Sequence, residues 1–430
     1  MRKIVFLIPA LLLLAACSQN YRPLSELQSQ DPYERWAADS LNIYSSYRTY
    51  PVPQVKQTPA PKGFEPVYVS MYARHGSRKL HREDYCSIPL SVLSEADSKG
   101  QLTPLGRTVL GKVKKVYDDL GTSLGDLTRV GEAQHRGIAQ RMYHSYKGVF
   151  TAPGAVVRCY STVVQRTMMS MFAENSALLS LNPGLEIERS ASKSLTCLNN
   201  QYSDPCSDDP HRPCDEYLEG HLDFEPILDR LFSGGRPQIE DKADLVRCLY
   251  LTGAIAPCLD IEGCYYLREL FTPGELYVLQ SGMNYMMYLR CGNSELNGDN
   301  TLPSQIPLLQ DIVDKADAAL ATDAPGADLR FGHDSYVMPL AALINLNGYG
   351  TRVSDRAQIE AVFPTYELIP MAANLQFVFY RNKKGIILVK LLHNEVESAI
   401  PVQTECFPYY RWEDVKAYFA ERISIYNDRI

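Results

Sequence analysis

Five consecutive residues, Arg74-His75-Gly76-Ser77-Arg78, place a guanidinium group on either side of one imidazole. The forked donors of arginine match the oxygens of a phosphate, and a glycine lets the backbone turn sharply and approach a ligand closely. Neighbouring cations oppose metal binding, so we do not expect His75 to be a metal ligand. Its imidazole is instead well placed to attack a bound phosphoryl group, and the segment predicts a metal-free site for phosphate chemistry.

The elements that must position these groups are strands. Val67, Val69 and Met71 alternate with residues that can face outward, which predicts a strand over 67–73. Two further strands are predicted over 155–158 and 327–331. Ligands of open α/β sheets bind in the crevice at the carboxyl ends of the strands. We therefore expect the polar residues at these three ends to meet at one point: Arg74, His75, Arg158 and His333.

Four short motifs resemble the signature of the histidine phosphatase superfamily, and within it the acid phosphatase and phytase branch. Residues 74–78 match Arg-His-Gly-x-Arg, and residues 127–131 match Leu-Thr-x-x-Gly. The third motif is an arginine followed by Ser/Thr and a second arginine, found here in Arg158, Ser161, Thr162 and Arg166. The fourth is the stretch 332–335, Gly-His-Asp-Ser, which matches the His-Asp form of the branch.

This resemblance implies a role for each matched residue. His75 is implied as the nucleophile that forms a phosphohistidine, and Asp334 as the general acid that protonates the leaving oxygen. His333, a further catalytic residue, is implied to bind the phosphate oxygens together with Arg74, Arg78 and Arg158. Arg166 is interpreted as structural. Neither a cofactor nor a metal is expected.

The resemblance and the order of the elements imply an α/β fold, with a three-layer core like that of phosphoglycerate mutase and a mostly helical inserted domain. We expect the core over 61–184 and 326–430, and the cysteine-rich helical insert over 185–325. Helices are predicted over 104–120, 128–147, 163–180 and 411–425, and a hairpin over 375–391. The site is expected in the cleft between core and insert.

The N-terminus reads as an export signal. Arg2 and Lys3 precede an apolar run over 4–16, which is too short to span a bilayer. The run ends Leu-Ala-Ala-Cys, which looks like a bacterial lipobox with Cys17 as the lipidated residue. We expect a signal peptide over 1–17, a tether over 18–60, and a protein held at the periplasmic or cell-surface side of a membrane by this lipid alone. An ordinary signal peptide is the alternative.

Composition limits the partners. The net charge of −7, from 43 basic and 50 acidic residues, disfavours nucleic-acid binding. Of the 11 cysteines, ten remain without Cys17, and an even number in an exported protein favours disulfides. The most plausible local pairs are Cys206 with Cys214 and Cys258 with Cys264. A zinc site formed by Cys206, His211 and Cys214 is the competing interpretation, although its spacing matches no common zinc finger.

The expected activity is therefore a phosphomonoesterase acting on a phosphorylated small molecule. Among the relatives implied, bacterial lipoproteins that resemble multiple inositol polyphosphate phosphatases match best, which favours inositol polyphosphates such as phytate. That subgroup has His-Ala-Glu where this chain has His333-Asp334-Ser335, so small sugar phosphates stay open as the alternative. A phosphoryl mutase and a non-catalytic phosphate-binding lipoprotein are the rival functions. Candidates for contacts to the rest of the substrate are Lys79, Arg82 and Lys193, for which solvated surface charge is the alternative. The sequence does not predict an oligomeric state.

Overall fold

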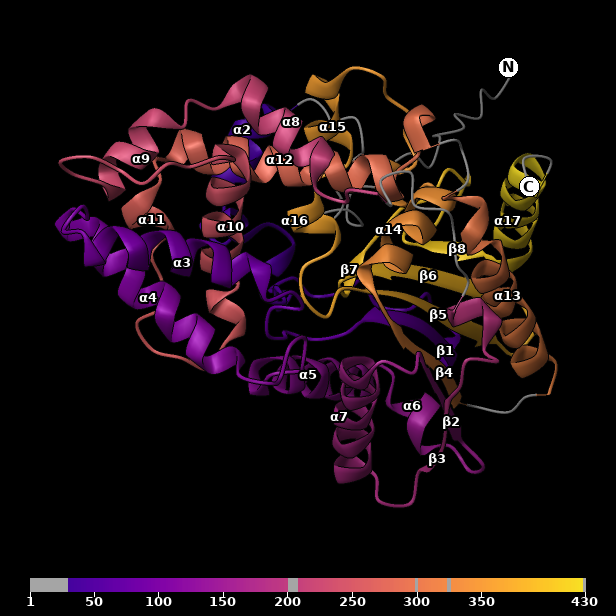
Figure 1. Ribbon diagram of the computed structural model, residues 1–430. Helices are drawn as coiled ribbons and strands as arrows, with labels where there is room; N and C mark the ends of the chain where they lie inside the picture. The colour runs from indigo at the N-terminus through magenta and orange to yellow at the C-terminus, as the bar shows by residue number, and fades with distance from the viewer. Residues whose placement is uncertain (1–29, 200–207, 298–300, 323–325, 428–430) are drawn as a thin grey trace, which may run out of the picture.

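The computed structural model describes residues 30–199, 208–297, 301–322 and 326–427 (Figure 1). A mixed sheet with helices on both faces lies beside a second part made almost entirely of helices. The predicted signal peptide, Cys17 and Cys206 lie outside the described residues. No helix within the described ranges is both long enough and apolar enough to cross a membrane.

The sheet has the strand order β3-β2-β4-β1-β5-β6-β7, with β8 paired to β6. Its first four strands are mutually parallel, whereas β5, β6, β7 and β8 add antiparallel pairs at the other edge. The strands are β1 (Phe64–Arg74), β2 (Val156–Ser161), β3 (Glu186–Ala191), β4 (Gly326–Gly332), β5 (Asn374–Asn382), β6 (Ile387–His393), β7 (Val396–Glu397) and β8 (Tyr409–Arg411).

Helices cover both faces of this sheet, which gives three layers (Figure 1). On one face, α5 (Arg129–Ser145), α6 (Lys147–Thr151) and α7 (Gln165–Leu181) bury apolar residues against alternate positions of β1, β2 and β4. On the other face lie α13 (Ile306–Ala321), α14 (Asp334–Leu343) and α17 (Trp412–Asn427). The predicted three-layer α/β core with a helical second part is confirmed.

Local sequence signals account for the helix starts nearest the site. The Oγ1 of Thr103 accepts a hydrogen bond from the Gly106 amide and so caps α4 (Pro104–Leu120). Thr128 caps α5 in the same way, through the amide of Gly131. Both are Thr N-caps, which satisfy donors that a helix start leaves without an intrahelical partner. The predicted hairpin is formed by β5 and β6, and the predicted final helix is α17.

The helical part is drawn from more of the chain than the predicted insert. Its apolar core contains residues of α3 (Asp84–Ser98) and α4, which lie before the insert in sequence. The predicted boundaries 185–325 are also wrong at both ends, because β3 near the first boundary joins the sheet and α13 near the last packs on it. The remaining helices of this part are α8 (Arg212–His221), α9 (Glu225–Leu231), α10 (Lys242–Ala254), α11 (Leu267–Leu270) and α12 (Pro273–Cys291), joined by α2 (Pro32–Ala37), α15 (Arg356–Val362) and α16 (Thr365–Leu368).

The predicted tether over 18–60 is wrong for its described portion. Trp36, Ile43 and Tyr47 are buried in the core of the helical part. Tyr50 is buried against the sheet, where its hydroxyl donates to Glu395 at 2.8 Å. Burial of four large side chains ties this segment to both parts of the molecule, so it is an integral piece of the fold.

The predicted disulfide between Cys258 and Cys264 is not formed. Cys258 lies with its Sγ 3.1 Å from the carbonyl oxygen of Tyr47, and Cys264 lies with its Sγ 3.4 Å from that of Ile261. Cys214 is buried in the apolar core next to Met283. These thiols serve as small apolar side chains of the helical part.

Candidate functional site

The strand β1 delivers Arg74 and His75 to the carboxyl edge of the sheet. Arg74 is paired in register with Gly332, the last residue of β4. The His75 amide donates to the Gly332 carbonyl at 2.9 Å, which holds the two strand ends together. His333 follows Gly332 directly, so the parallel pairing of β1 with β4 brings residues 258 positions apart to one place. The ring centroids of His75 and His333 are 5.7 Å apart.

Helix α5 packs on the loop that follows β1 and explains the second motif. Thr128 donates through both its amide and its Oγ1 to the carbonyl oxygen of Ser77, at 2.9 and 3.1 Å. Gln134 accepts from the Ser77 amide at 2.8 Å and donates to its hydroxyl at 2.9 Å. A Cβ on Gly131 would lie 2.2 Å from the Ser77 oxygen, and a Cβ on Gly76 would lie 2.4 Å from the Gly131 oxygen. Only glycine at both positions permits this close approach.

Helix α7 presents three residues to the same loop at helical spacing. Arg166, Ser170 and Glu174 lie four residues apart and therefore share one face of the helix. Ser170 accepts a hydrogen bond from the Gly76 amide at 3.1 Å. Arg166, in the first turn, lies close enough to His75 and His333 to lower the pKa of both imidazoles.

The hydrogen bonds of His75 define its reactive nitrogen. Its Nδ1 lies 2.9 Å from the carbonyl oxygen of Gly76. A carbonyl oxygen only accepts, so Nδ1 carries the proton and Nε2 keeps its lone pair. Burial lowers the pKa of His75 well below 6.5, and the nearby charges of Arg74, Arg166 and Arg78 lower it further. The imidazole is thus held neutral, with Nε2 as a potential nucleophile, even in mildly acidic solution.

Three guanidinium groups surround this imidazole. Arg74 is fully buried and donates from Nη1 to the carbonyl oxygens of Ser46, at 2.7 Å, and Ile369. Arg78 lies over the ring of Tyr47, with its Cζ 5.4 Å from the ring centroid. Arg166 is half-buried, and burial, joined by the charges of Arg78 and Arg74, lowers its pKa to about 10.

These three arginines retain unused donors. In each of them the Nε is buried and has no hydrogen-bond partner within the described part of the chain. Buried donors normally find an acceptor, and an arginine without one is costly. A phosphate group offers oxygens of the kind that arginine donors accept as partners. The arrangement has the chemistry of an anion site.

Asp334 supplies the one carboxylate in direct contact with this cluster within the described ranges. Its Oδ2 lies 2.7 Å from Nη2 of Arg74, and its Oδ1 accepts from the Ser335 amide at 2.8 Å in the first turn of α14. Burial alone would raise the pKa of Asp334, but Arg74, His333 and Arg78 outweigh it and hold the pKa at about 2. His333 has its Nε2 3.3 Å from the Oγ1 of Thr162. Burial and Arg166 lower the pKa of His333 to about 4.

The structure does not bring Arg158 to the site, which corrects the sequence prediction. Arg158 pairs in register with Asp328, whereas Arg74 pairs with Gly332, four residues further along β4. Four residues of strand correspond to about 13 Å. The side chain of Arg158 is 39% exposed, and its Nε lies 3.4 Å from the Oε2 of Glu188. The strand β2 continues to Ser161, so Arg158 lies in its middle, and the third guanidinium comes from Arg166.

Sequence reasoning also missed several contributors. Tyr47 and Ser46 come from the segment that was predicted to be a tether. Gln134 and His135 lie on α5, and His135 has its Nε2 3.1 Å from the carbonyl oxygen of Arg74. One available signal was the four-residue spacing of Arg166, Ser170 and Glu174, which places these three polar residues on one face of the helix.

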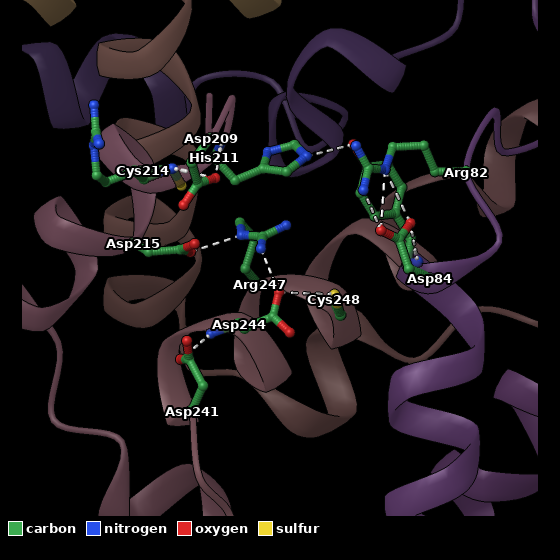
Figure 2. A network of polar contacts seen from close by, with 12 residues as sticks. Arg82, Asp84, Asp209, His211, Cys214, Asp215, Asp241, Asp244, Arg247 and Cys248 are labelled. Atoms are coloured by element: carbon green, nitrogen blue, oxygen red, sulfur yellow. Dashed lines mark hydrogen bonds and ion pairs between the residues drawn. The ribbon is translucent and has the colours of Figure 1, made fainter. Parts of the chain in front are cut away.

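The three candidates for outer contacts differ in placement. Lys79 is bound to Asp119 by an ion pair of 3.1 Å, and Lys193 is exposed just beyond β3. Arg82 lies at the start of the helical part and pairs with Asp84 (Figure 2). Burial lowers the pKa of the neighbouring His81 to about 3, as do the charges of Arg78 and Arg166. Within residues 78–82, Lys79 and Arg82 are thus each paired with an acidic side chain, and His81 is held neutral.

A polar network lies next to Arg82 (Figure 2). Its centre is the buried Arg247, which donates from Nε to Asp215 at 2.6 Å and from Nη2 to Asp244. His211 has its Nε2 2.8 Å from the Tyr85 hydroxyl, and Cys214 turns away into the apolar core. No group of three or more His, Cys, Asp or Glu side chains able to hold a metal occurs in the described ranges.

Comparisons with known proteins identify the fold. No family model and no curated protein matches the chain. Among solved structures, the multiple inositol polyphosphate phosphatase of Bifidobacterium longum superposes with a TM-score of 0.72 at 18% identity, covering 87% of this chain and 96% of that one. The phytase of D. castellii superposes with a TM-score of 0.65 at 14% identity, covering 90% and 86%. The chain thus has the fold of the acid phosphatase and phytase branch that its motifs resemble.

Proposed function

We propose that this protein is a phosphomonoesterase that passes its substrate's phosphoryl group through a covalent phosphohistidine at His75. The observation that carries the proposal is a neutral imidazole, with the Nε2 lone pair available, among three guanidinium groups. A neutral nitrogen is the form that can attack phosphorus, and cations around it offset the charge of the phosphoryl oxygens. Phosphoryl transfer depends mainly on such positioning and electrostatics.

The reaction has two steps that balance. In the first, Nε2 of His75 forms a bond to phosphorus, the ester P–O bond breaks, and protonated Asp334 gives its proton to the leaving alkoxide oxygen. In the second, water attacks the phosphohistidine, the N–P bond breaks, and the water's proton passes to Asp334. Inorganic phosphate leaves, and the neutral imidazole of His75 is restored. Its Nδ1–H stays hydrogen-bonded to the Gly76 carbonyl throughout. Arg74, Arg78, Arg166 and His333 bind the phosphoryl oxygens throughout.

The electrostatics favour catalysis in acid. The arginine field that holds the pKa of Asp334 at about 2 is partly neutralised when a phosphate dianion binds, so the carboxyl regains protons at higher pH. Burial, with the arginine charges as a smaller contribution, lowers the pKa of His75, so His75 stays unprotonated below its ordinary pKa. Nucleophile and acid are therefore both in their working forms at a pH below neutrality, where a histidine with an ordinary pKa of 6.5 would be largely protonated.

The substrate class proposed is inositol polyphosphates such as phytate. Structures of the Bifidobacterium longum enzyme were solved with inositol hexasulfate and with phosphate, and its fold is shared here over most of both chains. Arg82 follows Arg78 by four residues, and a further phosphate of such a substrate would replace Asp84 as its partner. Small sugar phosphates are the second candidate, because the carboxylate directly after His333 differs from the His-Ala-Glu of the polyphosphate subgroup.

A substrate panel tests the proposal. Purified protein is assayed for phosphate release from phytate, glucose phosphates and p-nitrophenyl phosphate, beside His75→Ala and the matched control His144→Ala, an exposed histidine on α5. We expect turnover by the wild type and by His144→Ala, and none by His75→Ala. Undiminished turnover by His75→Ala refutes the nucleophile assignment. Conversion of a phosphate ester into an isomer without free phosphate indicates a mutase, and tight phosphate binding without turnover on any substrate indicates a binding lipoprotein.

We further propose that the protein is exported and anchored by lipid on Cys17. The support is the apolar run over 4–16 followed by Leu-Ala-Ala-Cys. Expressed in a bacterium with labelled palmitate, the wild type should incorporate label and sediment with membranes. Cys17→Ser should incorporate no label and should no longer sediment with membranes. Equal labelling of both proteins contradicts the assignment.

A further inference from the structure

A histidine and a glutamate are buried together behind the proposed nucleophile. His135 on α5 and Glu174 on α7 are both fully buried. The Nδ1 of His135 lies 2.8 Å from the Oε1 of Glu174, and its Nε2 lies 3.1 Å from the carbonyl oxygen of Arg74. The imidazole also lies beside the ring of Phe331, with the centroids 5.9 Å apart.

Proton counting fixes how this pair is bonded. The carbonyl oxygen of Arg74 only accepts, so Nε2 of His135 must carry a proton. One further proton then lies between Nδ1 and Oε1, held either by the imidazole or by the carboxyl. In both forms the pair has no net charge, and Nε2–H donates to Arg74. Burial raises the pKa of Glu174, and the hydrogen bond from His135 opposes that rise.

The carbonyl that His135 holds belongs to the peptide joining Arg74 to His75. The N–H of the same peptide donates to Gly332 at 2.9 Å. On the far side of His75, the carbonyl accepts from the Ala372 amide at 3.0 Å, and the Gly76 amide donates to Ser170 at 3.1 Å. Each of the four polar groups in the two peptides that flank His75 is therefore hydrogen-bonded. Two of the four partners are side chains, and one of these is His135.

Stability alone gives little reason to retain such a pair. Two titratable groups in an apolar layer carry a desolvation cost, and apolar residues of similar volume are often as stable or more stable in such places. The surrounding residues of α5 and α7, including Ile138, Ala139, Ala177 and Leu178, already form an apolar core. An apolar pair in the same place would not donate a hydrogen bond to the carbonyl oxygen of Arg74, whereas His135 does.

Building on the proposed function, we infer that His135, fixed by Glu174, is a positioning residue that sets the backbone of His75 for in-line attack on phosphorus. The N–H that His135 donates to this carbonyl limits rotation of the Arg74–His75 peptide, and the orientation of the His75 ring follows that peptide. Small misplacements of a reacting group reduce rates by as much as a hundredfold. The guanidinium groups that bind phosphate are not held by this pair, so binding should be independent of it.

Two pairs of variants separate positioning from folding. His135→Leu removes the donor, whereas His135→Gln retains an N–H that can reach the Arg74 carbonyl. Glu174→Gln keeps a donor for Nδ1, whereas Glu174→Leu leaves Nδ1 without a partner. Each variant is assayed for kcat and KM with p-nitrophenyl phosphate and for inhibition by inorganic phosphate. Turnover is expressed per active site, counted from the binding of inorganic phosphate.

We expect His135→Leu to lower kcat per active site by about 10- to 100-fold, with KM and phosphate inhibition within about threefold of wild type. His135→Gln should recover most of this loss. If His135→Leu does not fold, Glu174→Leu should lower kcat several-fold while Glu174→Gln stays near wild type. The inference is overturned if His135→Leu keeps wild-type kcat, if His135→Gln fails to improve on it, or if Glu174→Gln loses as much as Glu174→Leu. A wild type without any phosphatase activity would instead overturn the proposed function.

Discussion

Replacing each of two arginines, Arg166 and Arg158, by alanine gives the sharpest mutational test of the site. Arg166→Ala removes one of the three guanidinium groups around His75, whereas Arg158→Ala removes a side chain about 13 Å away along the sheet. Loss of one donor that stabilises a transition state costs about 10²- to 10³-fold in kcat. Loss of an exposed ion pair such as that of Arg158 with Glu188 costs about 0–1 kcal/mol of stability. We therefore expect at least a hundredfold loss for Arg166→Ala and less than a twofold change for Arg158→Ala.

The pH profile gives Arg166 a second signature. Arg166 lowers the pKa of His75 and of His333, so its removal lets both values rise. Protonation of His75 abolishes its lone pair, and activity falls as pH drops through its pKa. The acidic limb of kcat/KM should therefore move to higher pH in Arg166→Ala and stay in place in Arg158→Ala. Steady-state kinetics with p-nitrophenyl phosphate from pH 3 to pH 8 measures both effects. A hundredfold loss in Arg158→Ala with near-normal Arg166→Ala would refute this account of the site.

Three other perturbations have defined outcomes. Asp334→Asn should lower kcat strongly for alkyl phosphates and less for p-nitrophenyl phosphate, whose leaving group needs less protonation; equal losses would argue against a general acid. Gly131→Ala should lower activity and thermal stability together, because its Cβ would lie 2.2 Å from the Ser77 oxygen; normal activity would contradict the packing. Burial raises the pKa of Glu360 from 4.5 to about 7, so the native state holds this proton more tightly than the unfolded chain, and stability falls as pH rises from 4.5 through 7. Urea unfolding of Glu360→Gln should remove about 3 kcal/mol of that fall; an unchanged pH dependence would contradict it.

Much of the sheet and its nearest helices could be predicted from the sequence because local signals are strong there. Alternating apolar residues indicate β1, and threonine caps followed by helical periodicity indicate α4 and α5. The nucleophile loop is contiguous in sequence, so Arg74, His75 and Arg78 needed no knowledge of the fold. His333 and Asp334 follow a short strand, β4, and its parallel pairing with β1 places them at the site.

Other parts of the site depend on tertiary contacts that local patterns do not contain. Arg158 belongs to the third motif, but the end of β2 is set by its pairing with β4. That pairing continues to Ser161, three residues beyond Arg158. Arg166 then follows at the start of a helix, and its orientation is fixed only when α7 packs beside α5. The segment around Tyr47 is polar and rich in proline on its C-terminal side, so its burial against Arg78 could not be inferred from composition.

The cysteine prediction failed for a similar reason. An even count in an exported protein favours disulfides, yet the apolar layers of the helical part accept thiols as small buried side chains. Cys264 lies six positions after Cys258, and the two thiols are hydrogen-bonded to different backbone carbonyl oxygens. Spacing alone does not report the direction in which two side chains point.

During turnover, His75 should become transiently phosphorylated. Protein mixed with a radiolabelled phosphate ester and quenched in alkali within milliseconds should carry label that is stable to base and labile to acid. Mass spectrometry should place the phosphate on the peptide that contains His75, and the label should be absent from His75→Ala. Turnover by the wild type with no labelled protein at any quench time, or label on another residue, would contradict the account.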